Sequence, residues 1–182
     1  MQTFAVYVDN KPGVLNRVAS LFRRRAFNIE SLTVGHTEMP GVSRMTIVVD
    51  TDERGARLVE ANLYKLIPVR RVDNITRVPT IGRDLAMIKV AATGDARTQV
   101  MQLVDVYRSR IVDVSPESLV IETTGTEDKI DSLLEVLRPY GVIEMVRTGR
   151  VEMARGIMQP TPIGTHQPER RAAPRDSDSG SV

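Results

Sequence analysis

The chain has 182 residues, of which 41% are hydrophobic and 26% charged, as is usual for a globular protein of one or two domains. It contains no cysteine, which excludes disulfides and thiolate chemistry. Its 25 basic and 23 acidic residues give a net charge of +2, too even to indicate nucleic acid as a partner. No apolar stretch approaches the ~20 residues of a membrane span, and no apolar signal segment opens the chain, so we expect a cytoplasmic protein.

Hydrophobic periodicity in the first 79 residues predicts the element order βαββαβ. Phe4, Val6 and Val8 alternate as on one face of a strand, whereas apolar residues recur at helical spacing from residue 14 onward. In the second helix we expect Leu58 and Val59 to face inward. The expected elements are a strand at 2–8, a helix from 14, strands at 29–34 and 45–49, a helix capped by Asp52 and running to about 66, and a strand at 69–78.

The same order repeats in the second half of the chain. The expected elements are a strand at 87–91, a helix from 95, strands at 111–114 and 119–123, a helix capped by Thr126, and a strand at 142–146. The predicted fold class is therefore α+β, with two tandem βαββαβ ferredoxin-like domains at 1–79 and 84–158. Each would be a four-stranded antiparallel sheet with two helices on one face. The uncovered faces and edge strands favour at least a dimer.

The residues from 159 to 182 differ in composition from everything before them. Four prolines and the ending D-S-D-S-G-S-V leave few large apolar groups in this segment. Burial therefore cannot offset an ordering entropy of ~1–2 kcal/mol per residue. We expect a disordered tail.

The segment D-N-K-P-G-V-L, from Asp9 to Leu15, has the chemistry of a small amino-acid pocket. Gly13 and Val14 open a helix, so their backbone N–H groups are free to bind a carboxylate. Asn10, and Asn28 within F-N-I-E-S-L, can accept from an ammonium group or donate to a carboxylate. On spacing alone an ordinary turn is the favoured interpretation of the same residues.

Catalytic constellations are missing from the sequence. The chain has two histidines, His36 and His166, and neither a zinc-protease motif, a nucleophile elbow nor a P-loop. The acidic pairs Asp52-Glu53 and Glu127-Asp128 fall in first helical turns, where carboxylates stabilise the helix. We expect no catalysis by this chain alone and no metal on it. The Arg23–Arg25 run is read as a helix end that complements the dipole, with a partner surface as the alternative.

Several of these segments carry a resemblance to a known family. N-K-P-G-V-L-N-R-V, F-N-I-E-S-L-T-V, I-V-D-V-S-P-E-S at 111–118 and V-R-T-G-R-V-E-M-A-R-G at 146–156 resemble the small regulatory subunit of acetolactate synthase, which carries an ACT domain. The likeness runs from residue 2 to about 157. In that family the subunit activates a large catalytic subunit and confers feedback inhibition, typically by valine, in branched-chain amino-acid synthesis.

The resemblance also implies partners and site residues. It implies a homodimer, with thiamine diphosphate, Mg²⁺ and FAD held by the large subunit and no cofactor on this chain. The effector pocket would take Asn10, Gly13, Val14 and Leu15 from one chain, and Asn28 and Ile29 from its dimer mate. Ala26 departs from the family, which usually has glycine there. The alternatives are a free-standing ACT-type sensor that regulates transcription or another enzyme and, less favoured, a nucleic-acid-binding protein.

Overall fold

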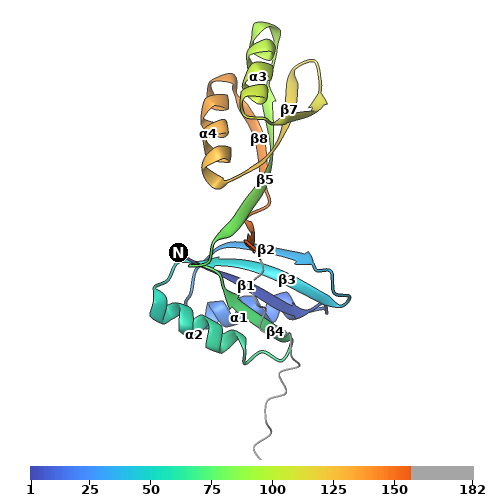
Figure 1. Ribbon diagram of the computed structural model, residues 1–182. Helices are drawn as coiled ribbons and strands as arrows, with labels where there is room; N and C mark the ends of the chain where they lie inside the picture. Colours follow the sequence, from blue (N-terminus) through green and yellow to red (C-terminus); the bar gives the residue numbers. More distant parts are fainter. Residues whose placement is uncertain (157–182) are drawn as a thin grey trace, which may run out of the picture.

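The computed structural model describes residues 1–156, which form two α+β units arranged end to end (Figure 1). The expected tail at 159–182 and the last two residues of the second expected domain lie outside the described residues. The fold class is as predicted: each unit has the order βαββαβ, and the two sheets have the equivalent strand orders β2-β3-β1-β4 and β6-β7-β5-β8.

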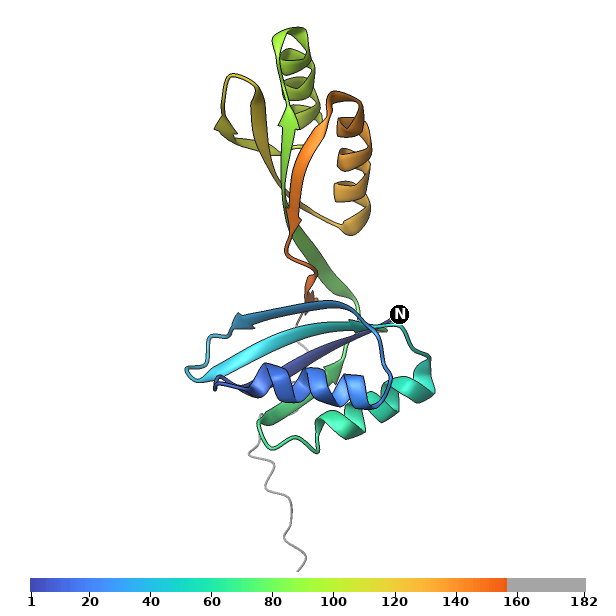
Figure 2. The same cartoon turned by 180° about the vertical axis from the view of Figure 1, so that it is seen from behind.

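The first unit is a four-stranded antiparallel sheet with both of its helices on one face (Figure 2). Its core lies between that face and the helices, where Phe4, Phe22, Met45, Ile47 and Leu63 are almost fully buried. The elements are β1 (Gln2–Asp9), α1 (Val14–Arg24), β2 (Ile29–His36), β3 (Val42–Val49), α2 (Glu53–Leu63) and β4 (Val69–Asn74).

The second unit repeats this arrangement. Ile88 and Ile121 of its sheet pack against Ile130, Leu133 and Leu137 of its last α-helix, and all five are fully buried. The elements are β5 (Thr80–Ala91), α3 (Gly94–Val106), β6 (Arg110–Val114), β7 (Ser118–Gly125), α4 (Glu127–Leu137), a 3₁₀ turn (Arg138–Tyr140), β8 (Val142–Arg147) and β9 (Val151–Ala154). Within residues 1–156, no helix combines the length and apolar composition that a membrane span requires.

Two expectations about the first unit are wrong in detail. Leu58 was expected to face inward, but it is 47% exposed because the buried stripe of α2 is centred on Ala56, Val59 and Leu63. Strand β4 ends at Asn74 rather than continuing to 78. There the Asn74 side chain accepts from the backbone N–H of Thr76, and this local turn competes with further pairing.

A long two-stranded ribbon that the sequence patterns do not predict joins the two units. Residues 80–83, which lie between the two expected domains, form the first part of β5 and pair with β9. Beyond Arg83, β5 continues as a central strand of the second sheet. Strand β9 lies on the face of the first sheet away from its helices, where Ala5 and Thr46 are buried. Part of the apolar surface expected to need a dimer partner is thus covered within the chain.

Candidate functional site

The N-terminus of α1 has no side-chain cap, and the N–H of Val14 makes only a long hydrogen bond, 3.4 Å, to the carbonyl of Lys11. Gly13 occupies the cap position with φ +80°, a left-handed conformation that glycine adopts without strain, and no side chain caps the turn. The first turn of α1 also contains no acidic residue. By contrast, Asp52 at the start of α2 accepts from the N–H of Gly55 at 2.7 Å. The positive end of the α1 dipole is therefore open to an anion.

The turn that presents Gly13 is held by a paired carboxylate. Asp9 Oδ1 lies 2.6 Å from Arg70 Nε, and Asp9 Oδ2 lies 3.0 Å from Lys11 Nζ. The hydrogen bond from Arg70, then that from Lys11, holds the pKa of Asp9 below its usual value. These contacts fix the end of β1 immediately before the turn.

Asn10 is exposed at the mouth of this turn and is oriented by two contacts. Its backbone N–H donates to the carbonyl of Gly41 at 2.9 Å, and its side-chain nitrogen lies 3.4 Å from His36 Nδ1. The carboxamide oxygen remains available to a ligand. Asn10 is thereby placed beside the last residue of the edge strand β2, a neighbour that the spacing of the motif did not reveal.

The remaining residues of the expected site fall in two different places. Val14 is a core residue with 6% exposure, so it could meet a ligand only through its backbone, whose N–H donates to the Lys11 carbonyl at 3.4 Å. Leu15 is 45% exposed and offers an apolar surface next to Gly13. Asn28, exposed, and Ile29, half-buried, lie beyond the other end of α1, where Asn28 donates to the Glu30 carboxylate. One chain thus brings Asn10, Gly13 and Leu15 together, but not Asn28 or Ile29.

A larger cavity of about 520 Å³ lies between the first sheet and β9, but its cations are already paired. Arg71 lies 2.8 Å from Asp73 and stacks 4.1 Å above the centre of the Tyr7 ring. Arg44 donates to Thr46 and to the carbonyl of Glu152. These pairings stabilise the sheet face, and they leave the α1 turn as the better candidate for a small zwitterion.

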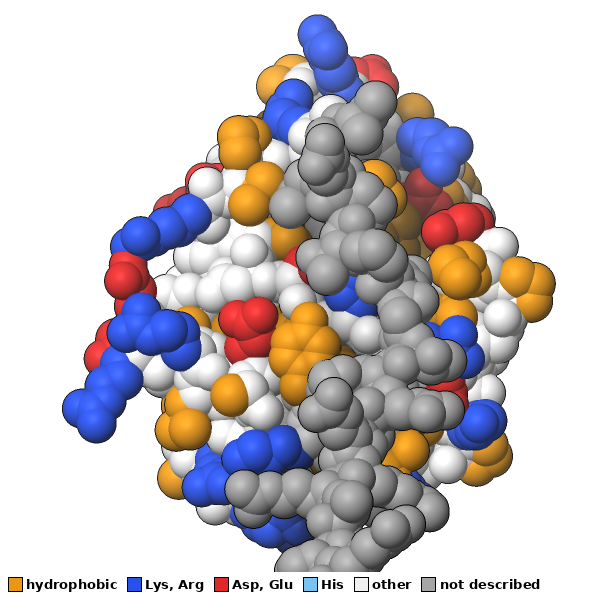
Figure 3. Space-filling model, turned by 60° about the horizontal axis from the view of Figure 1, so that its bottom comes forward, with side chains coloured by type: hydrophobic (Ala, Val, Ile, Leu, Met, Phe, Trp, Pro, Cys, Tyr) orange, Lys and Arg blue, Asp and Glu red, His pale blue; other side chains and the backbone are white. Residues whose placement is uncertain are grey.

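Residues 1–156 contain no group of three or more His, Cys, Asp or Glu side chains that could hold a metal ion. Arg23 and Arg24 occupy the last turn of α1, as the reading of that run as a helix end predicted. Figure 3 shows Lys and Arg side chains spread over the face it depicts, with acidic and apolar groups between them.

Comparison with known proteins assigns the family. Residues 4–71 match the model of the AHAS small subunit-like ACT domain, and residues 83–156 match that of the small subunit of acetolactate synthase. The chain belongs to the acetolactate synthase small-subunit family. It is a regulatory subunit of that enzyme, as the resemblance of its motifs implied.

Individual members of the family are similar to this chain over most of their length. The probable acetolactate synthase small subunit of Archaeoglobus fulgidus is 51% identical over 85% of this chain and 96% of its own. The acetolactate synthase small subunit of Bacillus subtilis is 44% identical over 84% of this chain and 89% of its own. The crystal structure of the small subunit from Thermotoga maritima superposes with a TM-score of 0.82, at 40% identity over 86% of this chain and 98% of that one.

Proposed function

We propose that the chain forms a twofold dimer through β2, binds valine at the two seams of that contact, and thereby inhibits the large subunit that it otherwise activates. In this proposal residues 1–79 are the effector-binding domain and 84–158 the C-terminal domain. The observation that carries the proposal is the uncapped start of α1 beside Asn10. Within one small turn, the helix start can bind the carboxylate of an amino acid and Asn10 can bind its ammonium group.

The geometry of β2 supports a shared site. It is an edge strand of eight residues, and its outer row of backbone groups is open to another strand. If two copies pair antiparallel along the whole strand, Ile29 lies opposite His36 of the second copy. His36 contacts Asn10 in its own chain. The pairing therefore brings Asn28 of one copy toward Asn10 and Gly13 of the other.

The chemistry of this seam suits a small aliphatic amino acid. Its carboxylate would bind at Gly13 and Val14, and the carboxamides of Asn10 and Asn28 would complete its polar contacts. Leu15 and Ile29 would cover the side chain. Ligands this small gain up to ~1.5 kcal/mol per heavy atom, so micromolar affinity is within reach. Regulation requires that valine bind one arrangement of the dimer more tightly than another.

The proposal is tested by mixing the chain with purified large subunit, loaded with thiamine diphosphate, Mg²⁺ and FAD, and assaying acetolactate formation. We expect activity to rise on mixing and to fall again with valine. Leucine and isoleucine serve as matched ligands of similar chemistry. Activity unaffected by the chain would refute its activating role, and activation insensitive to all three amino acids would refute the effector site. A free-standing sensor, in contrast, would not co-purify with the large subunit.

A further inference from the structure

The motif V-R-T-G-R-V-E-M-A-R-G at 146–156 forms the end of β8, the loop 148–150 and β9, where the chain crosses from the second sheet to the first. The loop is tied to β5 by reciprocal hydrogen bonds. Thr148 N donates to the carbonyl of Leu85 at 3.0 Å, and Leu85 N donates to Thr148 Oγ1 at 3.2 Å. The loop therefore moves with the C-terminal sheet.

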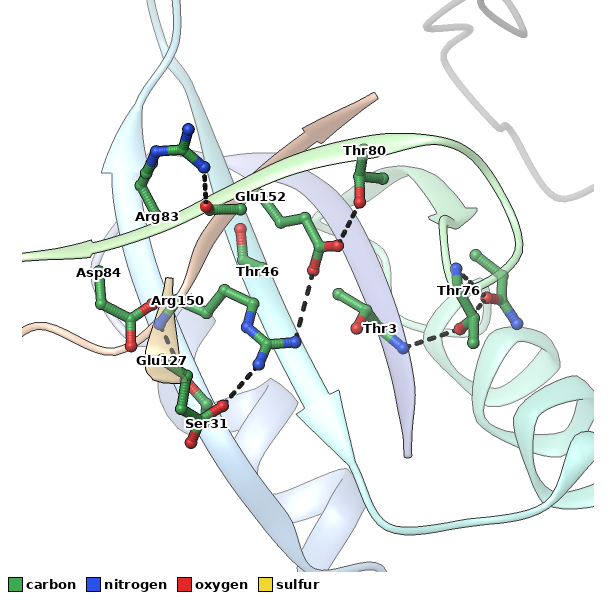
Figure 4. A network of polar contacts seen from close by, with 12 residues as sticks. Thr3, Ser31, Thr46, Thr76, Thr80, Arg83, Asp84, Glu127, Arg150 and Glu152 are labelled. Carbon is green, nitrogen blue, oxygen red and sulfur yellow. Dashed lines mark hydrogen bonds and ion pairs between the residues drawn. The ribbon is translucent and has the colours of Figure 1, made fainter. Parts of the chain in front are cut away.

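The next two residues of the loop touch β2 of the effector-binding domain (Figure 4). Arg150 N donates to Ser31 Oγ at 3.2 Å. Gly149 has φ +82°, and a Cβ there would lie 2.9 Å from Ser31 Oγ and 3.2 Å from Thr33 Oγ1. Both the conformation and the close approach require glycine. The loop thus fits against β2 two residues after Ile29.

Arg150 in the loop and Arg147 at the end of β8 connect this segment to α4. Arg150 Nη2 lies 2.7 Å from Glu127 Oε2, so this one residue contacts β2 through its backbone and α4 through its side chain. One turn further along α4, Asp131 pairs with Arg147, which also pairs with the buried Asp84. Burial alone would lower the pKa of Arg147, but its hydrogen bond to Asp84 and the surrounding carboxylates raise it. Arg147 is therefore a fixed anchor.

The junction between the units is polar and incompletely filled. A cavity of about 320 Å³ lies there, lined by Glu30, Ser31, Asp84, Glu127, Arg147 and Arg150 among others. Small polar contacts between domains permit relative motion. In addition, the pairing of β2 with β3 shifts register between Ile29 and Ser31. A displacement of Asn28 and Ile29 can thus move Ser31 while β2 and β3 stay paired.

We infer that Arg150 is the positioning residue that transmits effector binding at the start of β2 to α4 of the C-terminal domain. This inference rests on the proposed function. Arg150 touches neither the effector turn at Gly13 nor Asn28. Its role is to keep Ser31 and Glu127 in one fixed relation, so that movement of β2 displaces α4. Without the guanidinium, valine still binds, but the C-terminal domain no longer responds.

The test uses the holoenzyme with Arg150→Gln, which removes the charge that pairs with Glu127. The matched control is Arg83→Gln. The backbone of Arg83 is paired with that of Val151 in the same ribbon, and its side chain donates to the carbonyl of the neighbouring Gly82. Calorimetry first establishes the valine concentration that saturates each variant, and melting curves establish folding. We expect Arg150→Gln to bind valine with a dissociation constant within about threefold of that of the wild type. The factor by which saturating valine lowers activity should fall at least about fivefold.

Two further variants separate transmission from a merely structural role. Arg150→Lys keeps a charge that can reach Glu127 and is expected to restore part of the inhibition. Glu127→Gln removes the partner on α4 and is expected to reproduce the loss, with activation in the absence of valine retained. Full inhibition of Arg150→Gln at saturating valine, or loss of valine binding in it, would overturn the inference. Absent inhibition in the wild-type holoenzyme would instead refute the proposed function.

Discussion

Gly13 precedes helix α1 and Asn28 follows it, and the 11 residues of the helix alone span a distance of about 16 Å. A single amino acid is far shorter than this distance. The two residues can contact one ligand only if they come from different copies of the chain. The proposed effector site is therefore a property of the dimer, and each half of it can be tested separately.

Substitution of Gly13 tests the carboxylate-binding turn. Gly13→Asp adds a negative charge beside the ligand carboxylate, and Gly13→Asn adds a side chain of the same shape without charge. A Cβ at Gly13 meets no atom within 4 Å, and both residues tolerate a left-handed conformation, so the strain is matched. We expect valine affinity to fall at least about tenfold more for Asp than for Asn. Equal titration curves for the two variants would remove the carboxylate from this turn.

Asn28→Ala tests the second half of the site. A bound ligand would lose a hydrogen-bond partner, which costs roughly 1–3 kcal/mol of binding free energy. Isothermal titration with valine measures the loss, and Gln102→Ala, exposed on α3, is the control. Unchanged affinity in Asn28→Ala would exclude this residue from the pocket.

Val34→Pro tests the role of β2 in the dimer. Thr37 N donates to the carbonyl of Val42, so by alternation the N–H of Val34 points away from β3. Proline there removes an outward donor and leaves the internal ladder intact, whereas Val34→Ala keeps the donor. We expect sedimentation to show monomers for Val34→Pro and dimers for Val34→Ala. A dimer of unchanged affinity in both variants would place the contact elsewhere.

Ala26→Gly tests the backbone just before Asn28. Ala26 has φ +55°, in the left-handed region that glycine occupies without a steric penalty. The substitution is expected to stabilise the fold by roughly 0.5–1 kcal/mol, measured by urea unfolding. Ala61→Gly, within helix α2, should destabilise it by about 1 kcal/mol. Destabilisation by both substitutions would show that the conformation of Ala26 carries no penalty.

Asp9→Asn tests the ion pairs that hold the effector turn. Because the folded pKa of Asp9 is lowered from 3.8, its contribution to stability is present above that value and is lost as the pH falls through the folded pKa. At pH 7 the variant should lose on the order of 1 kcal/mol. As the pH falls through the folded pKa of Asp9, the unfolding free energies of the two proteins should converge. A difference independent of pH would assign the loss to packing.

The fold was largely predictable because its pattern is local. Alternation in β1 and the helical spacing of Val14, Val18 and Leu21 fix these elements irrespective of distant contacts. The ribbon of β5 and β9 was not predictable, because β9 is short and its partner lies about 70 residues earlier.

The candidate site was predictable only in part. The chemistry of Asn10 and Gly13 follows from residue types. In contrast, the pairing of Asp9 with Arg70 and the contact between Asn10 and His36 depend on tertiary structure. Glu127 illustrates the same limit. It occupies the first turn of α4 as expected, yet it also pairs with Arg150.

Subunit mixing tests the shared site most directly. Gly13→Asp and Asn28→Ala dimers are dissociated together and reassembled in equal amounts, and the sites of wild-type affinity are counted by calorimetry with valine. In a mixed dimer one seam combines the intact Gly13 of one copy with the intact Asn28 of the other, and the opposite seam carries both substitutions. A shared site predicts that valine binding returns to about a quarter of the wild-type number of sites. A site built within one chain predicts no recovery at all, and that result would contradict the account.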